Sequence, residues 1–511
     1  MATASHRATD TARRPRLRVH LALVVALGTW VCRPDAGTHP IILPAVCADT
    51  AAAPVVRVPQ RVFYVHASAG NDAADGLTPA TAWRTLDKAN STARPGDLFL
   101  LTGAFASQVI RPAASGTATD RIVYRVRPGT TAVLELGQSD VLVWLDGLAY
   151  IVVDGLELRN VEYAIQLHDG ANHNWLRNLH VHDVGAAFHL WGSSDNRLED
   201  SKIERCGEPV SNTGDCIWIA DGSSRNHIVR NTMSFAGHGL IDIGGDQVGQ
   251  PPSTDNVVAL NDLANTWANN LGLIGYARRT LVECNRIRSA STSGINYERA
   301  GIQIAADSNI VRFNEVFDNA ADGIQVQGYD FGGLIQNARG NAIYQNTIWG
   351  NGGAGVQVFQ GQTGQVANNI IENNIIWGNN ASPDSVVARN VDGVSWDFFV
   401  DLYHAASGWS AGSLNGNVIR NNIAARNAAD IGQGWLFILQ PSGTTQELTL
   451  TQAQATFADV VANLQADPLF VSVTGRDFRL QTTSRAVDAG RIIPGVPYLG
   501  AAPDLGVHEL R

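Results

Sequence analysis

The chain repeats one short pattern of apolar and polar positions at intervals of about thirty residues. An apolar residue, two further residues, an asparagine, one more residue and a second apolar residue recur, as in 228–233 and 258–263. The asparagines lie 30, 24, 29 and 32 residues apart, at Asn231, Asn261, Asn285, Asn314 and Asn346. A repeat of this length is typical of a solenoid, in which each unit buries its apolar face only against its neighbours.

The elements inside each repeat are predicted to be short β-strands. Apolar residues alternate with polar ones over stretches too short for the apolar face of a helix, and Asn and Gly separate these stretches. We therefore predict an all-β protein, a parallel β-helix with one coil per repeat. The asparagines are expected at sharp corners, because Asn tolerates left-handed backbone geometry. Their buried amides should bond to one another across a spacing of about 5 Å. The row should continue to Asn374 and Asn422, with Leu156, Leu179 and Ser201 at the earlier corners.

A second signature follows each corner, and it indicates which side chains point outward. It reads Gly-Ile-Gln-Ile at 301–304, and similar sequences begin at Gly323 and Gly355. Alternation places the isoleucines inside and the glutamine outside. The same rule gives one outward residue for each coil, with the coil near Gly272 ambiguous: Gln166, His189, Trp218, Asp242, Gln303, Gln325 and Gln357. The three glutamines are expected to form a structural stack, bonded amide to amide.

The first 48 residues are typical of an export signal. Arginines at 13, 14, 16 and 18 precede an apolar run, 21–31, that is too short to span a bilayer. Cleavage is expected after Ala48, so we predict a secreted or periplasmic protein with no membrane contact after cleavage. No basic stripe accompanies the net charge of −10, which excludes the usual nucleic-acid binder.

The predicted organisation has five parts. Residues 1–48 are the signal peptide, 49–60 a linker, 61–130 an N-terminal cap with the opening strands, 131–430 the parallel β-helix, and 431–511 the last coil with a C-terminal cap. Within these parts we expect helices at 81–93 and 451–464. An aromatic-rich loop, 383–415, should pack against the solenoid.

The two ends of the mature chain resemble secreted right-handed β-helix proteins of the pectate-lyase-like superfamily. The resemblance is carried by Tyr64-Val65, Gly70-Asn71-Asp72, Thr81-Ala82-Trp83, Pro95-Gly96-Asp97 and the ending Pro503 to Glu509. It implies a right-handed solenoid and a polysaccharide lying along the outer face of the strands that carry the second signature. It does not by itself identify a catalytic residue.

Candidate functional residues lie on that face and in the loops before it. We expect catalytic roles for five residues: Asp215, His238, Asp242, Glu298 and Arg299. Six further residues are expected to bind substrate: His189, Trp218, Tyr276, Arg278, Gln303 and Gln325. Aromatic rings offer flat faces to sugars, and arginine pairs with carboxylates. By contrast, His180 and His182 are expected to be solvated or locally bonded.

The five cysteines include two that lie ten residues apart across one loop, Cys206 and Cys216. In an oxidising compartment they would close that loop as a disulfide, and two buried thiols are the alternative. Cys284 is expected to be an ordinary core residue.

Three functions fit this sequence. The first is a polysaccharide lyase acting on a uronate-containing glycan by β-elimination, with calcium as a possible cofactor. Lysine, a usual base in such lyases, is not available on the face that carries His189 and Asp242, because Lys202 projects from a different strand. The second is a glycoside hydrolase that uses paired carboxylates from Asp215, Asp242 and Glu298. The third is a non-catalytic glycan-binding β-helix. In each case the partner is a polysaccharide and the protein is expected to be a monomer.

Overall fold

The structure is a computed structural model, in which the chain divides into two compact units, Met1–Ile41 and Ile42–Arg511. It describes residues 47, 54, 56–137, 140–207, 214–245, 247–290, 300–360, 364–379, 398–401, 414–425, 427–432, 434–439 and 445–510. All of these residues belong to the second unit. None of the helices among them is long and apolar enough to cross a membrane.

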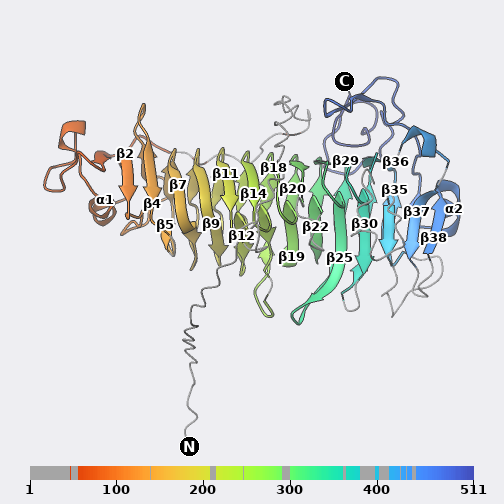
Figure 1. Ribbon diagram of the computed structural model, residues 1–511, viewed down its shortest axis with the longest axis horizontal. Coiled ribbons are helices and arrows are strands. Elements are labelled where there is room, and N and C mark those ends of the chain that lie inside the picture. Colours follow the sequence, from red (N-terminus) through yellow and green to blue (C-terminus); the bar gives the residue numbers. More distant parts are fainter. Residues whose placement is uncertain are drawn as a thin grey trace, which may run out of the picture. The chain divides into compact units, whose positions relative to one another are not determined.

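The chain winds into a parallel β-helix whose coils each have three sides. In the coil of Asn231, the first side is β13 (His227–Val229), the second is β14 (Thr232–Ala236) and the third is β15 (Ile241–Ile243). Each strand pairs in parallel with the matching strand of the next coil, β17, β18 and β19 respectively. Figure 1 shows these coils following one another from β2 to β37. The predicted all-β, parallel β-helix fold is confirmed.

Most of the remaining strands extend the three sides in both directions. The first side also contains β1 (Arg61–His66), β2 (Asp97–Ala106), β3 (Ile122–Val126), β6 (Ile151–Asp154), β8 (Trp175–Arg177), β10 (Arg197–Glu199), β17 (Val257–Ala259), β20 (Leu281–Glu283), β23 (Ile310–Arg312), β28 (Ala342–Tyr344), β32 (Ile370–Glu372), β35 (Val418–Arg420) and β39 (Val460–Val461). The second side also contains β4 (Ala132–Glu135), β7 (Glu157–Leu167), β9 (His180–Trp191), β11 (Lys202–Cys206), β18 (Asp262–Ala264), β21 (Arg286–Arg288), β24 (Glu315–Phe317), β29 (Thr347–Trp349), β33 (Ile375–Trp377) and β36 (Ile423–Ala425). The third side also contains β5 (Val141–Trp144), the ends of β7 and β9, β12 (Ile217–Ala220), β19 (Leu271–Arg278), β22 (Ile302–Asp307), β25 (Ile324–Phe331), β30 (Val356–Gln360), β34 (Phe398–Asp401) and β37 (Gly434–Leu439).

The predicted asparagine row forms a continuous ladder inside the solenoid. The amide of Asn231 donates to Asn261 at 3.1 Å, and each later member donates to the next at 2.9–3.0 Å as far as Asn463. All of these side chains are buried. The expected stacking is therefore confirmed.

The prediction that asparagine itself adopts left-handed backbone geometry at the corners is wrong. The residue with left-handed backbone geometry is the one before each asparagine, such as Arg230, Leu260, Cys284 and Phe313, with φ between 55° and 61°. The asparagine instead supplies hydrogen bonds to backbone groups that the corner leaves unpaired. For example, Asn285 donates to the Val258 carbonyl and accepts from the Asn261 N–H.

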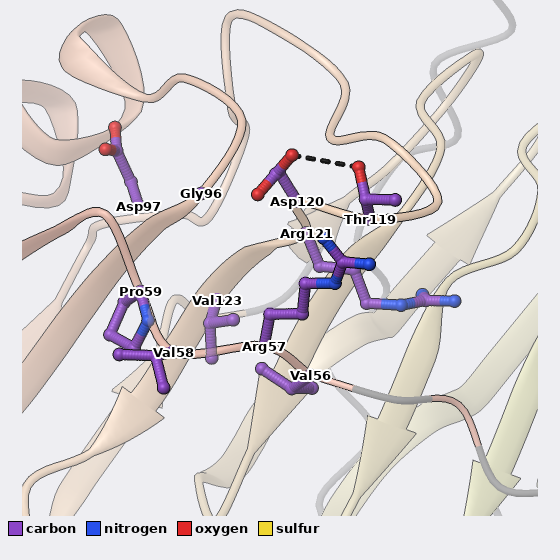
Figure 2. A pocket seen from close by; sticks show the side chains of 10 residues that line it. All are labelled: Val56, Arg57, Val58, Pro59, Gly96, Asp97, Thr119, Asp120, Arg121 and Val123. Atoms are coloured by element: carbon purple, nitrogen blue, oxygen red, sulfur yellow. Dashed lines mark hydrogen bonds between the residues drawn. The ribbon is translucent and has the colours of Figure 1, made fainter.

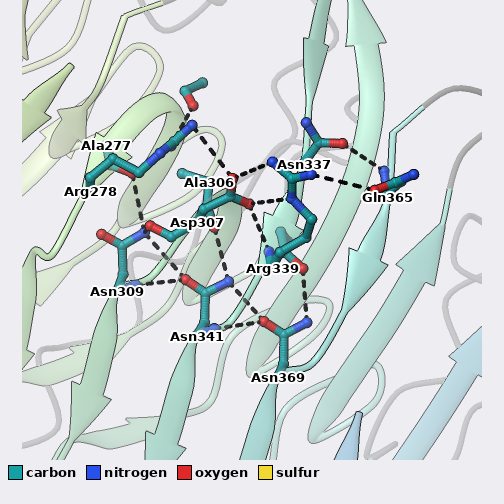
Figure 3. Close-up of polar contacts among 12 residues, drawn as sticks. Ala277, Arg278, Ala306, Asp307, Asn309, Asn337, Arg339, Asn341, Gln365 and Asn369 are labelled. Carbon is teal, nitrogen blue, oxygen red and sulfur yellow. Dashed lines mark hydrogen bonds and ion pairs between the residues drawn. The ribbon is translucent and has the colours of Figure 1, made fainter. Parts of the chain in front are cut away.

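A second asparagine ladder, at the corner before the first side, was not predicted. It runs through Asn174, Asn196, Asn226 and Asn256 in the early coils, and Asn309 donates to Asn341 and Asn341 to Asn369 in the later ones (Figure 3). Its members lie five residues before those of the first ladder, as Asn226 does before Asn231.

The N-terminal helix is shorter than the sequence indicates. The structure has α1 at Leu86–Thr92, capped by Thr85, while Trp83 lies in a short parallel bridge with Val65. The expected start at 81 is therefore wrong, because Asp72 accepts hydrogen bonds from the backbone of Arg84 and Thr85 and holds this stretch extended. Leu86 and Ala89 of α1 pack into the core.

The C-terminal helix is also shorter than expected, because α2 covers only Leu450–Thr456 and the following residues form a turn and β39. Beyond it, the hairpin of β40 (Phe470–Ser472) and β41 (Asp477–Leu480) packs against the second side, where Phe478 contacts Phe317 and Trp349. Within the expected loop at 383–415, residues 398–401 form β34 of the third side. Most of the rest of that loop lies outside the described residues.

Two disulfides join cysteines of the described chain. Cys206 and Cys216 form a disulfide, with Cα atoms 5.1 Å apart. Of the two predicted alternatives, the disulfide is therefore confirmed and the pair of buried thiols is not. Cys284 is bonded to Cys47, 237 residues away, so its expected role as an ordinary core residue is wrong. The sequence places these two cysteines far apart, and only the fold shows that their side chains meet.

Candidate active site

One row of outward side chains runs along the third side. Strand register aligns nine residues in successive coils: Trp144, Gln166, His189, Trp218, Asp242, Gly272, Gln303, Gln325 and Gln357. We call these residues the outer row. Alternation predicted every member except Trp144 and Gly272, and the register resolves the ambiguous coil as the glycine.

The outer row meets a loop cluster at Asp242. His238 Nδ1 lies 2.7 Å from Asp215 Oδ1 and 3.4 Å from Asp242 Oδ2. The Gly239 N–H also donates to Asp215 at 2.8 Å. Three of the five residues predicted to be catalytic are thus in direct contact, although they come from two coils. We call Asp215, His238 and Asp242 the acid–histidine cluster.

Local structure explains why these three residues converge. Asp215 lies three residues before outer-row Trp218, and Gly239 lies three residues before outer-row Asp242, so the two positions stack. The disulfide at Cys216 is adjacent to Asp215 in sequence. A Cβ atom at Gly272 would lie 2.3 Å from Asp242 Oδ1, so a glycine there leaves room for the carboxylate.

The cluster holds two carboxyl groups in a small, partly buried space. Asp242 is only 4% exposed. Burial raises the pKa of Asp242 above its usual value, and the neighbouring Asp215 carboxylate raises that pKa further, while His238 opposes the shift. A raised pKa means that the protonated form of Asp242 is favoured, as expected when two carboxyl groups are close together.

The donor set does not suit calcium. Each of the three residues offers one ligand atom, and these atoms lie within 4.8 Å of one another. Calcium takes six to eight oxygen ligands, whereas an imidazole beside carboxylates is typical of transition metals. We therefore derive no step of the chemistry through calcium.

Aromatic side chains surround the outer row beside the cluster. The His189 ring stacks on Tyr163 with centroids 5.3 Å apart, and it lies 5.2 Å from the Trp218 ring. Trp191 meets Trp218 edge to face at 5.6 Å. All four rings are half-buried, so part of each remains open to solvent. Flat apolar rings of this kind are suited to contact with sugar rings.

His189 is held in its neutral form. Burial and, to a smaller extent, the neighbouring His168 lower its pKa to about 4, while Asp146 opposes this shift. His168 Nε2 lies 2.9 Å from His189 Nδ1, so one ring donates to the other. His189 is therefore an uncharged ring at neutral pH, suited to stacking and hydrogen bonding.

The glutamines of the outer row form only part of the expected stack. Gln325 donates to Gln357 at 2.6 Å, but Gln303 instead accepts from Asn269 at 2.6 Å. Within the described part of the chain, Gln303 Nε2 and Gln325 Oε1 are buried without a hydrogen-bond partner. A donor and an acceptor in adjacent coils are thus left for a ligand or for water.

Tyr276 and Arg278 lie at the end of β19, several residues beyond Gly272. The Tyr276 hydroxyl accepts from the Gly249 N–H, and Arg278 pairs with Asp307 at 3.6 Å. Asp307 is also bound by Arg339 at 2.8 Å (Figure 3). The structure therefore does not bring Arg278 to the acid–histidine cluster. The two remaining catalytic candidates, Glu298 and Arg299, lie outside the described residues.

A cavity of about 370 Å³ lies elsewhere, on the first side of the opening coils. It is lined by residues such as Arg57, Arg125 and Trp175. A smaller neighbouring pocket, shown in Figure 2, is lined by Val56–Pro59 together with Asp97, Asp120 and Arg121. Both are bordered by the segment that precedes β1. Neither contains a residue of the outer row.

Sequence reasoning missed Tyr163, His168 and Trp191. Tyr163 and His168 flank Gln166, and Trp191 follows His189 by two positions on the same strand face. Reading every second residue to the ends of these strands and just beyond would have found Trp191 and His168, which follow His189 and Gln166 by two positions. Tyr163 lies three positions before Gln166, so simple alternation does not place it on that face.

Comparisons with known proteins place the fold. A family profile described as "Right handed beta helix region" matches residues 137–262. The crystal structure of pectate lyase Pel9A superposes with a TM-score of 0.51 at 17% identity, over 89% of this chain and 97% of that chain. An alginate lyase from Paenibacillus sp. covers 60% of this chain and 94% of its own, at 21% identity and a TM-score of 0.40. The lacto-N-biosidase from Eubacterium ramulus covers 75% and 66%, at 15% identity and a TM-score of 0.41. No curated protein matches. The chain is similar in fold to pectate lyase Pel9A, and the family profile describes that fold as a right-handed β-helix.

Proposed function

We propose that this protein is an exported polysaccharide lyase that cleaves a uronate-containing glycan by β-elimination at the acid–histidine cluster. The single observation that carries the proposal is the contact of His238 Nδ1 with Asp215 at 2.7 Å and Asp242 at 3.4 Å, next to a row of aromatic rings. Two disulfides among the described residues support an oxidising compartment.

His238 is assigned as the base. An ionised carboxylate only accepts hydrogen bonds, so Asp215 orients the imidazole by accepting a hydrogen bond from Nδ1, and we assign Nε2 as the atom that takes the substrate proton. Nε2 takes the proton from the carbon next to the uronate carboxylate, and Asp215 stabilises the resulting imidazolium. This is the orienting role that a carboxylate plays beside many catalytic histidines.

The elimination balances with two residues. The C5–H bond and the C4–O4 bond break and a C4=C5 double bond forms, while the C5 proton passes to His238 and Asp242 gives its proton to the leaving oxygen O4. A proton then passes from the imidazolium to Asp242, which restores the cluster. The pKa of Asp242, raised first by burial and then by the Asp215 carboxylate, suits this role as the acid. Arg299 is assigned to pair with the uronate carboxylate, as the sequence suggests.

Carboxyl spacing argues against the hydrolase alternative. Glycoside hydrolases hold their two carboxyl groups roughly 5–5.5 Å apart for retention or roughly 6.5–9.5 Å apart for inversion. The ligand atoms of Asp215, His238 and Asp242 all lie within 4.8 Å of one another. This separation is shorter than either range, so it favours the lyase over a hydrolase that uses Asp215 and Asp242.

The test is an assay of the purified protein on a panel of polyuronates and neutral glycans, with His238→Gln beside the wild type. We expect ultraviolet absorbance from the new double bond with a polyuronate, and its loss in the variant. The matched control is His173→Gln, an exposed histidine far from the cluster along the sequence, which should keep the wild-type rate. New reducing ends without absorbance would establish a hydrolase instead. Binding of glycans with no cleavage would establish the non-catalytic role.

A further inference from the structure

A second group of histidines and carboxylates lies on a different face from the outer row. It consists of Glu157 at the start of β7 and His180 and His182 at the start of β9, on the second side of two successive coils. Strand register places Glu157 beside His180, and His182 lies two residues further along the same face. The potential ligand atoms of the three residues lie within 4.8 Å of one another.

We propose that Glu157, His180 and His182 form a zinc site that cross-links these two coils. Two imidazoles and one carboxylate are a common protein ligand set for Zn²⁺, with water in the fourth position. The proposal does not depend on the reaction proposed above, because none of these residues belongs to the outer row or to the acid–histidine cluster.

The hydrogen bond between His182 Nδ1 and Asp183 supports the proposal of a metal site. Its Nδ1 lies 2.6 Å from Asp183 Oδ2, so this nitrogen carries the proton. The other nitrogen, Nε2, faces Glu157 Oε1 at 3.3 Å. In the neutral imidazole these are two acceptors facing one another, an arrangement that requires a cation between them or a second proton on the ring.

The distance between those two acceptors suits zinc. Zinc binds imidazole nitrogen and carboxylate oxygen at roughly 2.0–2.2 Å in tetrahedral geometry, which places two ligand atoms about 3.4 Å apart. The observed 3.3 Å between His182 Nε2 and Glu157 Oε1 therefore needs little adjustment on binding.

His180 shows the same supporting pattern. Its Nε2 lies 3.1 Å from Glu204 Oε1 on the following coil, and its other ring nitrogen, Nδ1, remains as a ligand. The two ring centroids are 4.4 Å apart, so both histidines face one region. Metal-binding histidines usually donate their second N–H to a carboxylate, and both of these do so.

The arginine and lysine side chains near these three residues do not prevent a metal ion from binding. Arg159 donates to Glu157 at 2.9 Å, Lys202 pairs with Glu204 at 2.9 Å, and Arg205 pairs with Asp183 at 2.7 Å. A carboxylate has about four acceptor sites, so Glu157 can hold Arg159 and a metal together. The side chains of His180 and Glu157 are 41% and 31% exposed, which gives an ion access from solvent.

The experiment is zinc titration of the chelator-treated, purified protein, followed by calorimetry. It is carried out in an Asp242→Asn background so that the acid–histidine cluster does not contribute. We expect one zinc ion per chain, loss of binding in His182→Ala, and unchanged binding in His173→Gln. Asp183→Asn removes the negative charge that supports the His182 imidazole and weakens the pairing with Arg205, so it should weaken binding by about 10–100-fold.

Thermal unfolding gives a second readout. Zinc should raise the unfolding temperature of the protein but not that of His182→Ala, because a ligand that binds only the folded state stabilises it. Cobalt in place of zinc should give the visible absorption of a four-coordinate site. If His182→Ala does not fold, Asp183→Asn and His180→Gln, which alter more exposed residues, still decide the question. Absence of zinc binding, or binding that these variants leave unchanged, would overturn the proposal.

Discussion

At the scale of single residues, Asp242 is the carboxyl group of the proposed site whose pKa the fold raises. Replacing it by asparagine keeps its shape and removes its proton. We expect Asp242→Asn to lower kcat by about 10²–10⁴-fold, the usual contribution of an acid–base group. Steady-state kinetics on the cleaved glycan would measure this, and turnover at the wild-type rate would show that the reaction occurs elsewhere.

The same substitution should not destabilise the protein. The folded-state pKa of Asp242 is raised, so its contribution to stability is fully present below its unfolded pKa of 3.8 and is lost as pH rises through the folded value. At neutral pH, Asp242→Asn should therefore unfold at an equal or higher urea concentration than the wild type. A clear loss of stability at neutral pH would contradict the raised pKa.

Asp322 gives a sharper test of this effect away from the cluster. It is buried, and burial raises its pKa to about 7 despite a hydrogen bond from the Ala354 N–H. Because the raised value favours the protonated form, stability is lost as pH rises from about 4 to 7. Asp322→Asn keeps the acceptor for Ala354, so at pH 8 it should be more stable by up to about 4 kcal/mol. Urea unfolding at pH 4 and pH 8 measures the difference, which should vanish at the lower pH.

Sequence reasoning located much of the site at this scale because alternation holds around the outer-row positions of the central coils. It found His189, Trp218 and Asp242 in one row, and it found Asp215 and His238 in the loops before that row. It failed for Arg278, because φ is positive at Gly275 and the register shifts along β19. It also failed for Cys284, whose partner is 237 residues away and carries no repeat signature.

At the scale of elements, the asparagine ladder is the main polar feature inside the coils. The Asn285 side chain makes four hydrogen bonds, two with Asn261, one with Asn314 and one with the Val258 carbonyl. Removing it leaves several buried groups unpaired, at about 1–3 kcal/mol for each.

We therefore expect Asn285→Ala to lower the free energy of unfolding by at least about 3 kcal/mol. The control is Asn172→Ala, since Asn172 is more exposed and its side chain bonds only to the nearby Gly170 carbonyl and the adjacent His173 ring. Urea unfolding of both variants would test this. Equal stability of the two variants would show that the ladder is not a stabilising element.

Short strands were predictable at this scale, while helix limits were not. The Val–x–x–Asn–x–Ile pattern defines two strands and a corner at once, so β20 and β21 follow from it directly. The start of α1 depends on Asp72, which binds the backbone of Thr85 from 13 residues earlier. Helical periodicity carries no information about such a contact, so the predicted helix began too early.

At the scale of the whole molecule, the bond between Cys47 and Cys284 conflicts with the predicted signal cleavage after Ala48. Cleavage there would remove Cys47, and the disulfide would not form. We therefore expect the exported protein to begin at or before residue 47. Intact mass and N-terminal sequencing of the unreduced, secreted protein would measure this, and a chain that begins at Asp49 would contradict it.

The ladder distances also have a consequence for how such a molecule can change over time. From one asparagine to the next the chain uses between 24 and 48 residues, yet the amide-to-amide contact stays at 2.9–3.1 Å. The number of residues in a coil therefore does not change the contact at its corner. An insertion at a loop therefore adds new surface without altering the rise of the coils above and below it. Mutation can accordingly remodel the walls around the outer row while the alignment of His189, Trp218 and Asp242 is inherited unchanged.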